Sequence, residues 1–355
     1  MAKMWRTVDR QTAWRIRARS EPTRRVTGGV PQLDFANDFE QIRAHFGCCK
    51  TMKRIILRAL MGVGIVLGVG LVAVAGFAWT QARAFDASVQ SVYALTLPAV
   101  VRSTEPATLA RGKHLIESIA GCAAQSCHGA DLGGGAPISM GPMGRLVGPN
   151  ITGGGMLSVY SDGELARLIK SGVKKDGRTV LMMPVPDFYW LPDADISAIV
   201  SYLRTVPSSD KANGSTHVGL LGKVLDRQGK FPWDIARVVK NLPKPSPPAP
   251  SPTQAYGQYV VRLCTGCHGE TLSGGPIPGA PPSIPTPLNI TMHETGIKNH
   301  TFEDFERLLK TGVRKNGTQL NPFMAVELTR NLDDIELRAL WAELQARPPK
   351  AFGGR

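Results

Sequence analysis

Two stretches of the chain, about 140 residues apart, carry the same motifs in the same order. Both contain a Cys-His-Gly triplet, then an Asn-Ile-Thr triplet, and then a Lys-Ser/Thr-Gly-Val segment. The paired positions include Cys127 with Cys267, Asn150 with Asn289, Arg167 with Arg307, and Leu203 with Leu344. A repeat of this length indicates two copies of one domain, because solenoid repeats recur roughly every 20–50 residues.

Each copy is predicted to consist of short helices joined by long loops. Ser161–Glu164 and Thr301–Asp304 resemble capping boxes, in which a hydroxyl and an acidic side chain satisfy backbone N–H groups at a helix start. Gly172 and Gly312 are placed to end the helices that follow. Apolar residues at helical spacing then predict a closing helix in each copy. They are Ile196, Ile199, Val200 and Leu203 in the first copy and Leu337, Leu340, Trp341 and Leu344 in the second.

The repeat sets the expected domain boundaries. We expect one domain at residues 100–207 and the other at residues 253–349. Residues 208–252 are expected to be a Pro-rich linker, because the proline-dense segment Pro243–Pro252 is typical of a stiff extended spacer. The expected fold class is all-α, with one N-terminal transmembrane helix followed by two small helical domains.

An uncharged run from Ala59 to Trp79 predicts a transmembrane helix over residues 55–81. At about 1.5 Å of rise per residue, the run matches a hydrocarbon core of about 30 Å. The basic residues that precede it place its N-terminal side in the cytoplasm, so both domains would face the periplasm from a single-pass helix in a bacterial inner membrane. A cleaved signal peptide is the alternative, because Ala82-Arg83-Ala84 resembles a cleavage site.

Residues 1–54 form a basic segment that is expected to lie in the cytoplasm. Within residues 1–58 there are 13 Lys and Arg against five Asp and Glu, which is more than half of the chain's net charge of +14. Because the rest of the chain has no Arg-rich helix or aromatic–basic surface, nucleic acid is not expected as a partner. Met52-Lys53-Arg54 also resembles a translation start, which would leave the first 51 residues outside the protein.

The second copy contains a complete haem-attachment pattern, Cys264-Thr-Gly-Cys267-His268. Two thiols one helical turn apart reach the two vinyl groups of one haem, and the next residue turns its imidazole onto the iron. A zinc site would need two further ligands nearby, and a thioredoxin-type pair needs no adjacent histidine. The motif therefore predicts a covalently bound haem c.

The first copy has a wider cysteine pair, because four residues separate Cys122 from Cys127 before His128. A longer loop can bulge out while both thiols and the histidine keep their places. The repeat aligns Cys127-His128 with the second copy's motif and so favours a second covalent haem. A Cys122–Cys127 disulfide and a haem held by a single thioether are the alternatives.

A methionine is expected as the second ligand of each iron, because a soft thioether opposite histidine stabilises the ferrous state. Met183 lies 55 residues after His128, and Met324 lies 56 residues after His268. Met182 is the immediate rival, but the offset between the closing helices places Met183 on Met324. The histidines without a counterpart are expected at the surface or in loops, and they are His114, His217, His293 and His300.

Residues from about 105 to 349 resemble two class I cytochrome c domains, and the pair is similar to the mono- and dihaem cytochrome c group that includes cytochrome subunits of periplasmic dehydrogenases. The resemblance rests on Cys267-His268-Gly269, the Asn-Ile-Thr and Lys-Ser/Thr-Gly-Val segments, and Met183-Pro184. It implies all-α folds around haem, His/Met ligation and electron transfer. The wider first cysteine pair departs from the pattern, and two haem motifs are fewer than the three of alcohol dehydrogenase cytochrome subunits.

With histidine and methionine on both irons, no coordination site stays open for a substrate, so an electron carrier rather than an enzyme is expected. It would relay electrons from a periplasmic or membrane dehydrogenase to a respiratory acceptor, either an oxidase or a soluble cytochrome, while its N-terminal helix contacts membrane lipid. A dihaem peroxidase, which needs one iron that can lose its distal ligand, and a haem-based sensor, which needs a cytoplasmic signalling domain, are the alternatives.

Overall fold

The structure is a computed structural model that describes residues 35–212, 214–243, 246, 248–278, 280 and 284–355. The chain divides into a unit up to Gly70 and a unit from Leu71 to Arg355. The described residues are mostly helical, as the sequence predicts, and their short strands form one three-stranded sheet. The predicted basic segment, residues 1–54, lies outside the described residues as far as residue 34.

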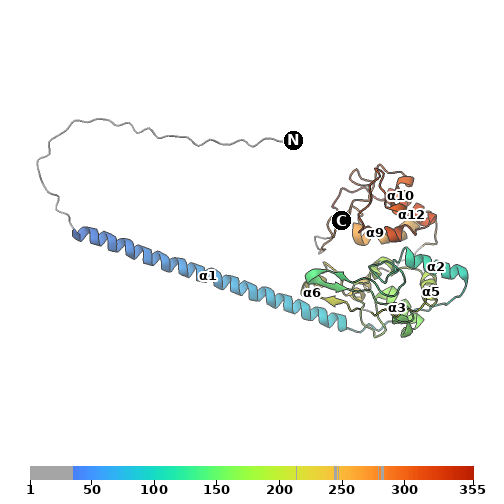
Figure 1. Cartoon of the computed structure of the whole chain (residues 1–355), viewed down its shortest axis with the longest axis horizontal. Helices are drawn as coiled ribbons and strands as arrows, with labels where there is room; N and C mark the ends of the chain where they lie inside the picture. Colours follow the sequence, from blue (N-terminus) through green and yellow to red (C-terminus); the bar gives the residue numbers. More distant parts are fainter. Residues whose placement is uncertain (1–34, 213, 244–245, 247, 279, 281–283) are drawn as a thin grey trace, which may run out of the picture. The chain divides into compact units, whose positions relative to one another are not determined.

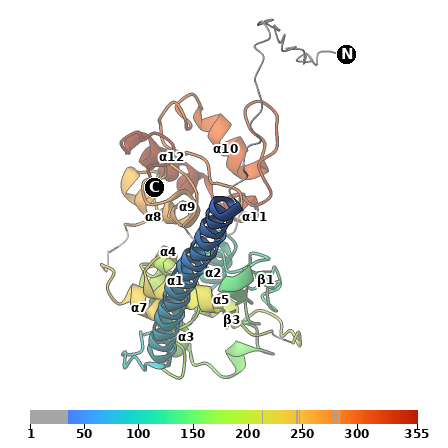
Figure 2. The same ribbon diagram turned by 90° about the vertical axis from the view of Figure 1, so that its left-hand side faces the viewer.

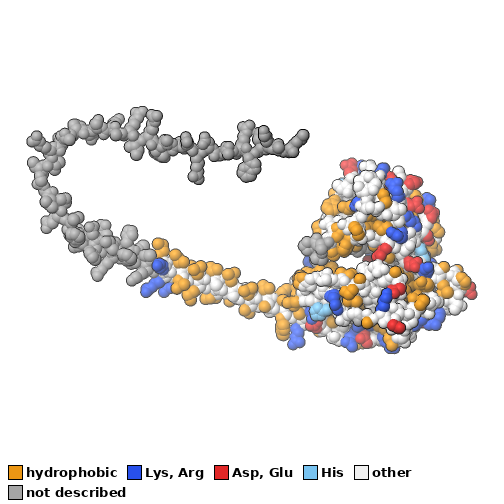
Figure 3. All heavy atoms as spheres, viewed as in Figure 1, with side chains coloured by type: hydrophobic (Ala, Val, Ile, Leu, Met, Phe, Trp, Pro, Cys, Tyr) orange, Lys and Arg blue, Asp and Glu red, His pale blue; other side chains and the backbone are white. Residues whose placement is uncertain are grey.

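The first helix, α1, spans Phe35–Gln90 and is therefore longer than the helix predicted for residues 55–81. Within the described residues, its part Met52–Gln90 is the one helix long and apolar enough to cross a membrane, with a mean hydropathy of 2.4 in its most apolar window. The large apolar side chains of this run are exposed, among them Leu67, Leu71 and Val72 (Figure 3). Such a surface is unfavourable in water and favourable in hydrocarbon.

The last turns of α1 pack onto the folded part of the chain. The Phe85 side chain is only 2% exposed and belongs to a small hydrophobic cluster with Trp233. Lys223 pairs with Asp86 at 2.7 Å, and the hydroxyl of Ser88 donates to the carboxylate of Asp234. The C-terminal end of α1 is therefore held by both apolar and polar contacts.

The elements of the two copies follow in chain order (Figures 1 and 2). The first copy contains α2 Pro106–Glu117, β1 Ile138–Ser139, the 3₁₀ helix η1 Gly141–Met143, β2 Gly144–Leu146, the 3₁₀ helix η2 Met156–Ser158, α3 Asp162–Ser171, α4 Val185–Phe188 and α5 Asp193–Leu203. The second copy contains α8 Gln254–Val260, α9 Arg262–His268, α10 Phe302–Thr311, α11 Val326–Thr329 and α12 Asp334–Ala346. Both views show α9, α10 and α12 grouped together (Figures 1 and 2).

Helix ends repeat from one copy to the other. Both predicted capping boxes are present: Ser161 and Thr301 each accept the N–H of the third helical residue, whose side chain accepts the N–H of the cap. Gly172 and Gly312 end these helices in the left-handed region, with φ of 69° and 74°. The predicted closing helices are confirmed as α5 and α12.

Two glycines set the crossing of the first and last helices in each copy. A Cβ on Gly112 of α2 would lie 2.1 Å from the carbonyl oxygen of Ala198 in α5. A Cβ on Gly257 of α8 would lie 2.0 Å from the carbonyl oxygen of Ala339 in α12. Both distances are far below van der Waals contact, so only glycine permits this backbone approach. The two copies therefore share the same helix crossing.

Residues 208–252, which the sequence predicts to be a Pro-rich linker, instead contain regular secondary structure in their first part. It contains β3 His217–Val218, which pairs antiparallel with β2, and the helices α6 Leu220–Arg227 and α7 Ile235–Val239. The fully buried carboxylate of Asp226 explains why this segment folds, because it accepts the backbone N–H groups of Trp233 and Asp234 and pairs with Arg237 at 2.8 Å. From Pro243 to Pro252, no described residue belongs to a helix or strand.

Candidate haem-attachment sites

The motif of the second copy lies on a helix, as its spacing predicts. Cys264, Cys267 and His268 all belong to α9, and His268 is its last residue. Both thiols are free. Burial, and then the neighbouring Cys267 thiol, raise the pKa of the Cys264 thiol to about 12. The Cys264 thiol therefore stays uncharged against the apolar core, whereas Cys267 is exposed.

A backbone carbonyl fixes the orientation of the His268 ring. The Nδ1 atom lies 2.7 Å from the carbonyl oxygen of Leu288, and because a carbonyl can only accept, Nδ1 must carry the hydrogen. This tautomer leaves the lone pair on Nε2 free for a metal. Burial lowers the pKa of the 8% exposed His268 ring, against the opposing hydrogen bond to Leu288, which favours the neutral form that binds iron.

The Asn-Ile-Thr triplet holds the loop that supplies this carbonyl. The side-chain oxygen of Asn289, the residue after Leu288, accepts both the backbone N–H and the hydroxyl of Thr291, each at 2.8 Å. The N–H of Ile290 donates to Leu272, which lies at a left-handed φ of 62°. Since a non-glycine residue rarely adopts that conformation, surrounding contacts must hold it in place.

The first copy repeats this arrangement around His128. The Nδ1 atom of His128 lies 2.7 Å from the carbonyl oxygen of Pro149, which directly precedes Asn150. The side-chain oxygen of Asn150 accepts the N–H and the hydroxyl of Thr152 at 2.9 and 2.7 Å. Leu132 occupies the same left-handed region as Leu272, with φ of 58°. Burial lowers the pKa of His128 as it does that of His268.

The wider cysteine pair of the first copy lies in a series of turns rather than on a helix. The N–H of His128 donates to the carbonyl oxygen of Cys122, which closes the longer loop between them. Burial, and then the Cys127 thiol, raise the pKa of the Cys122 thiol to about 12, as happens in the second copy. Both thiols are free, so the structure contains no Cys122–Cys127 disulfide. Of the four residues between the cysteines, Gln125 and Ser126 are exposed.

The two rival methionines have different surroundings. Met183 packs against the main hydrophobic core, as do Cys122, Cys264 and Met324. Met182 packs instead against the small cluster around Trp233, and its backbone N–H donates to the Trp233 carbonyl oxygen at 3.1 Å. The structure thus places Met183 and Met324 on the core that also contacts an attachment cysteine in each copy. Met182 lies on the smaller cluster.

A cavity of about 690 Å³ lies beside Met324. Its lining includes Leu320, Phe323 and Val326, together with Gln125 and Ser126 from the wider cysteine loop of the first copy. No attachment cysteine and neither ligand-candidate histidine lines it.

The donor set fits a haem in both copies. Each copy offers a pair of free thiols, a neutral imidazole with Nε2 available, and a thioether, which are the groups that hold a c-type haem. The sequence motifs do not predict the roles of Pro149 and Leu288, whose carbonyl oxygens orient the two histidines. Their position immediately before each Asn-Ile-Thr triplet was the available signal.

Comparison with known proteins identifies one of the copies. Residues 109–207 match the cytochrome c family. These residues form a cytochrome c domain. Such a domain binds haem c covalently and transfers electrons, and the match falls on the copy with the wider cysteine pair.

Similar proteins include cytochrome subunits of several dehydrogenases. The chain is 38% identical over 93 residues to the cytochrome c subunit of a quinone alcohol dehydrogenase of Gluconobacter oxydans, covering 24% of this chain and 20% of that protein. It is 32% identical over 111 residues to the fructose dehydrogenase cytochrome subunit of Gluconobacter japonicus, covering 28% and 23%. The gluconate 2-dehydrogenase cytochrome c subunit of Pantoea cypripedii is 32% identical over 93 residues, covering 24% and 21%. The chain therefore spans about a fifth of the length of these relatives.

Proposed function

We propose that the chain is a membrane-anchored dihaem c-type cytochrome that relays electrons from a dehydrogenase to a respiratory acceptor. The observation that carries the proposal is the repeated histidine environment. In both copies, Nδ1 of the histidine bonds to the carbonyl that precedes an Asn-Ile-Thr triplet, at 2.7 Å in each case. This repetition supports a second cytochrome c domain at residues 253–349 beside the domain already matched.

The proposed haem sites follow from this equivalence. In the first site Cys122 and Cys127 form the thioethers, and His128 and Met183 bind the iron. In the second site Cys264 and Cys267 form the thioethers, and His268 and Met324 bind the iron. The haem supplies a one-electron couple. The protein orients the imidazole through a backbone carbonyl, packs the first cysteine of each pair, Cys122 and Cys264, against the apolar core, and leaves no ligand position for substrate.

The proposed donor is a dehydrogenase in the periplasm or the membrane, because the similar proteins are named as cytochrome subunits of dehydrogenases. The proposed acceptor is an oxidase or a soluble cytochrome. Attachment to the inner membrane is supported by the exposed apolar surface of α1, and the periplasmic location of both copies by the basic residues that precede it.

Counting covalent haems tests the proposal. Intact mass and haem-stained denaturing gels should give two haems for the native chain. Replacing Cys264 and Cys267 together with alanine should remove one haem, and replacing Cys122 and Cys127 should remove the other. Each pair serves as the matched control of the other. A native chain with one haem would refute the dihaem proposal, and Cys122→Ala alone will show whether the first haem keeps one thioether.

A further inference from the structure

The two copies contact one another through equivalent residues. When Gly112 of α2 is aligned with Gly257 of α8, His114 of the first copy is equivalent to Tyr259 of the second. Within α5 and α12, which both begin with aspartate, Asp195 corresponds to Glu336. The structure pairs these four residues crosswise. The Nε2 atom of His114 lies 2.8 Å from a carboxylate oxygen of Glu336, and the hydroxyl of Tyr259 lies 3.4 Å from one of Asp195.

A second crosswise pair lies one helical turn further on. Glu117 and Arg262 are equivalent by the same glycine alignment, and Trp190 is equivalent to Asn331. The amide of Asn331 donates to the Glu117 carbonyl oxygen at 2.8 Å. In the reciprocal position, the guanidinium of Arg262 lies 4.8 Å from the ring centre of Trp190.

A third pair of contacts joins each attachment motif to the short helix that follows the methionine of the other copy. A Cβ on Gly121, just before Cys122, would lie 2.9 Å from a methyl carbon of Leu328 in α11. A Cβ on Gly266, between the cysteines of the second copy, would lie 3.4 Å from a carboxylate oxygen of Asp187 in α4. Asp187 and Leu328 are equivalent residues four positions after their methionines. Each attachment motif therefore contacts the helix that follows the methionine of the other copy.

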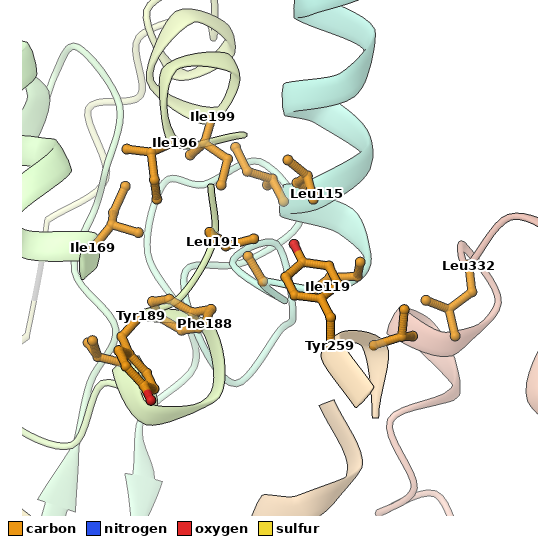
Figure 4. Close-up of a cluster of buried hydrophobic side chains, with 14 of the residues drawn as sticks. Leu115, Ile119, Ile169, Phe188, Tyr189, Leu191, Ile196, Ile199, Tyr259 and Leu332 are labelled. Carbon is orange, nitrogen blue, oxygen red and sulfur yellow. The ribbon is translucent and has the colours of Figure 1, made fainter. Parts of the chain in front are cut away.

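Contacts of this kind define an isologous interface, in which residue i meets residue j and the equivalent of j meets the equivalent of i. The interface is continuous with the core, because Tyr259 and Leu332 of the second copy share one hydrophobic cluster with Ile119 and Leu191 of the first (Figure 4). Arg111 adds charge across it, bonding to Asp195 at 2.9 Å and approaching Glu336 at 3.5 Å. A shared apolar core opposes the free movement expected of domains joined only by a linker.

We propose that this interface is the route of electron transfer between the two copies, with His114, Tyr259, Asp195 and Glu336 as positioning residues. The inference rests on the proposed presence of two haems. One electron passes from the reduced haem of one copy, which becomes ferric, to the oxidised haem of the other, which becomes ferrous. No bond is made or broken. The dehydrogenase supplies the electron and the respiratory acceptor removes it.

The helices themselves provide the matched test variants. Asp195→Ala with Glu336→Ala removes both carboxylates of the crosswise pair and leaves Arg111 without its two carboxylate partners. The control is Asp193→Ala with Asp334→Ala, two residues earlier on the same helices. These aspartates are also equivalent, but they are 74% and 65% exposed and pair with Lys170 and Arg338. Both double variants lose two charges from the first turn of α5 and α12, and the interface variant also loses the Glu336 oxygen that accepts the backbone N–H of Asp333 at 3.0 Å.

The experiment measures electron transfer in the full chain after flash reduction of one haem. The interface variant should transfer electrons about tenfold more slowly or worse, because small losses of positioning carry large costs in rate. Pulsed electron paramagnetic resonance should show weaker haem–haem coupling, while the potential of each haem measured separately stays unchanged. The control variant should match the native chain in both measurements.

A second variant guards against misfolding. Asp195→Asn with Glu336→Gln keeps the side-chain oxygens that accept from Tyr259 and His114, so it should restore most of the native rate. If the alanine variant holds two haems and keeps the native rate and the native coupling, the inference about the interface is wrong, while the proposed function still holds. A single haem in the native chain would overturn the proposed function and this inference with it.

Discussion

Among single residues, the neighbours Met182 and Met183 show how packing separates a ligand candidate from a structural side chain. Met183 lies on the core that contacts Cys122, whereas Met182 has a left-handed φ of 60° and packs near Trp233. The sequence offset favours Met183 for a reason unrelated to packing, so the two arguments support one another. Ligation itself stays a prediction.

The methionine prediction concerns access to the iron. Met324→Ala should open one iron per chain, so that the reduced protein binds about one carbon monoxide and that haem's potential falls, because the thioether no longer favours the ferrous state. Met183→Ala should do the same in the first copy. Met182→Leu is the control and should leave the reduced protein inert to carbon monoxide. Carbon monoxide binding by the native protein, with turnover of peroxide, would favour the peroxidase alternative.

Asp187 carries a prediction about pH. Burial, and then the negative charge of Glu270, raise its pKa to about 7, although Arg262 opposes the shift. An unfolded aspartate titrates near pH 3.9 or so, so between that pH and about 7 the folded state binds the extra proton and stability falls as pH rises. Asp187→Asn removes this titration. The melting temperature of the variant should therefore exceed that of the native protein by more at pH 8 than at pH 5. Asp193→Asn, at an exposed aspartate, is the control for the loss of one carboxylate.

At the scale of helices, the crossing glycines make the two copies alike. Gly112→Ala and Gly257→Ala each force a Cβ to within about 2 Å of a carbonyl oxygen, at 2.1 and 2.0 Å. Each should destabilise the protein by about 1–3 kcal/mol, as overpacking of a well-packed core does. Lys113→Ala, on the exposed side of α2, should change stability by less than about 0.5 kcal/mol. Chemical denaturation of the full chain measures both. Equal stability of Gly112→Ala and Lys113→Ala would contradict the close crossing.

The helices of the repeat could be predicted because their signals are local. A capping box needs two residues three positions apart, and both predicted boxes are present. The helices α6 and α7 escaped prediction because the prolines that follow them dominate the segment, while the buried carboxylate of Asp226 organises it. The role of Asp226 could not be predicted from the sequence, because it depends on the positions of Trp233 and Arg237 in three dimensions.

The contact between the copies could not be predicted either, but the reason is different. His114, expected at the surface or in a loop, lies on α2 and bonds to the buried Glu336, which is 222 residues away along the chain. No local pattern reports such a pair. The repeat identifies which residues are equivalent, but only coordinates show that the equivalents meet crosswise. The attachment motifs, in contrast, are local and could be recognised from the sequence alone.

For the whole molecule, α1 is the element that joins the apolar run to the folded part of the chain. It continues without interruption from Phe35 to Gln90, through the cleavage-like Ala82-Arg83-Ala84. Beyond that triplet, Phe85 and Ser88 pack against residues of the segment after the first copy. Cleavage after Ala84 would keep these contacts and remove residues 1–84, which include the apolar run. Folding of the two copies is therefore the same with an anchor as with a signal peptide, and membrane association distinguishes them.

We expect the full chain to stay in the membrane pellet after carbonate extraction, with both haems attached and the apolar run present in its intact mass. The physical reason is the hydrophobic effect: burying the exposed apolar side chains of Ala59 to Trp79 in hydrocarbon stabilises the inserted helix. A chain that starts at Phe85, expressed behind a cleavable export signal, is the control and should be released to the soluble fraction with two haems. The opposite outcome is a native protein in the soluble fraction, with the mass of a chain that begins at Phe85. In that case the apolar run is a cleaved signal, and the protein has no membrane anchor.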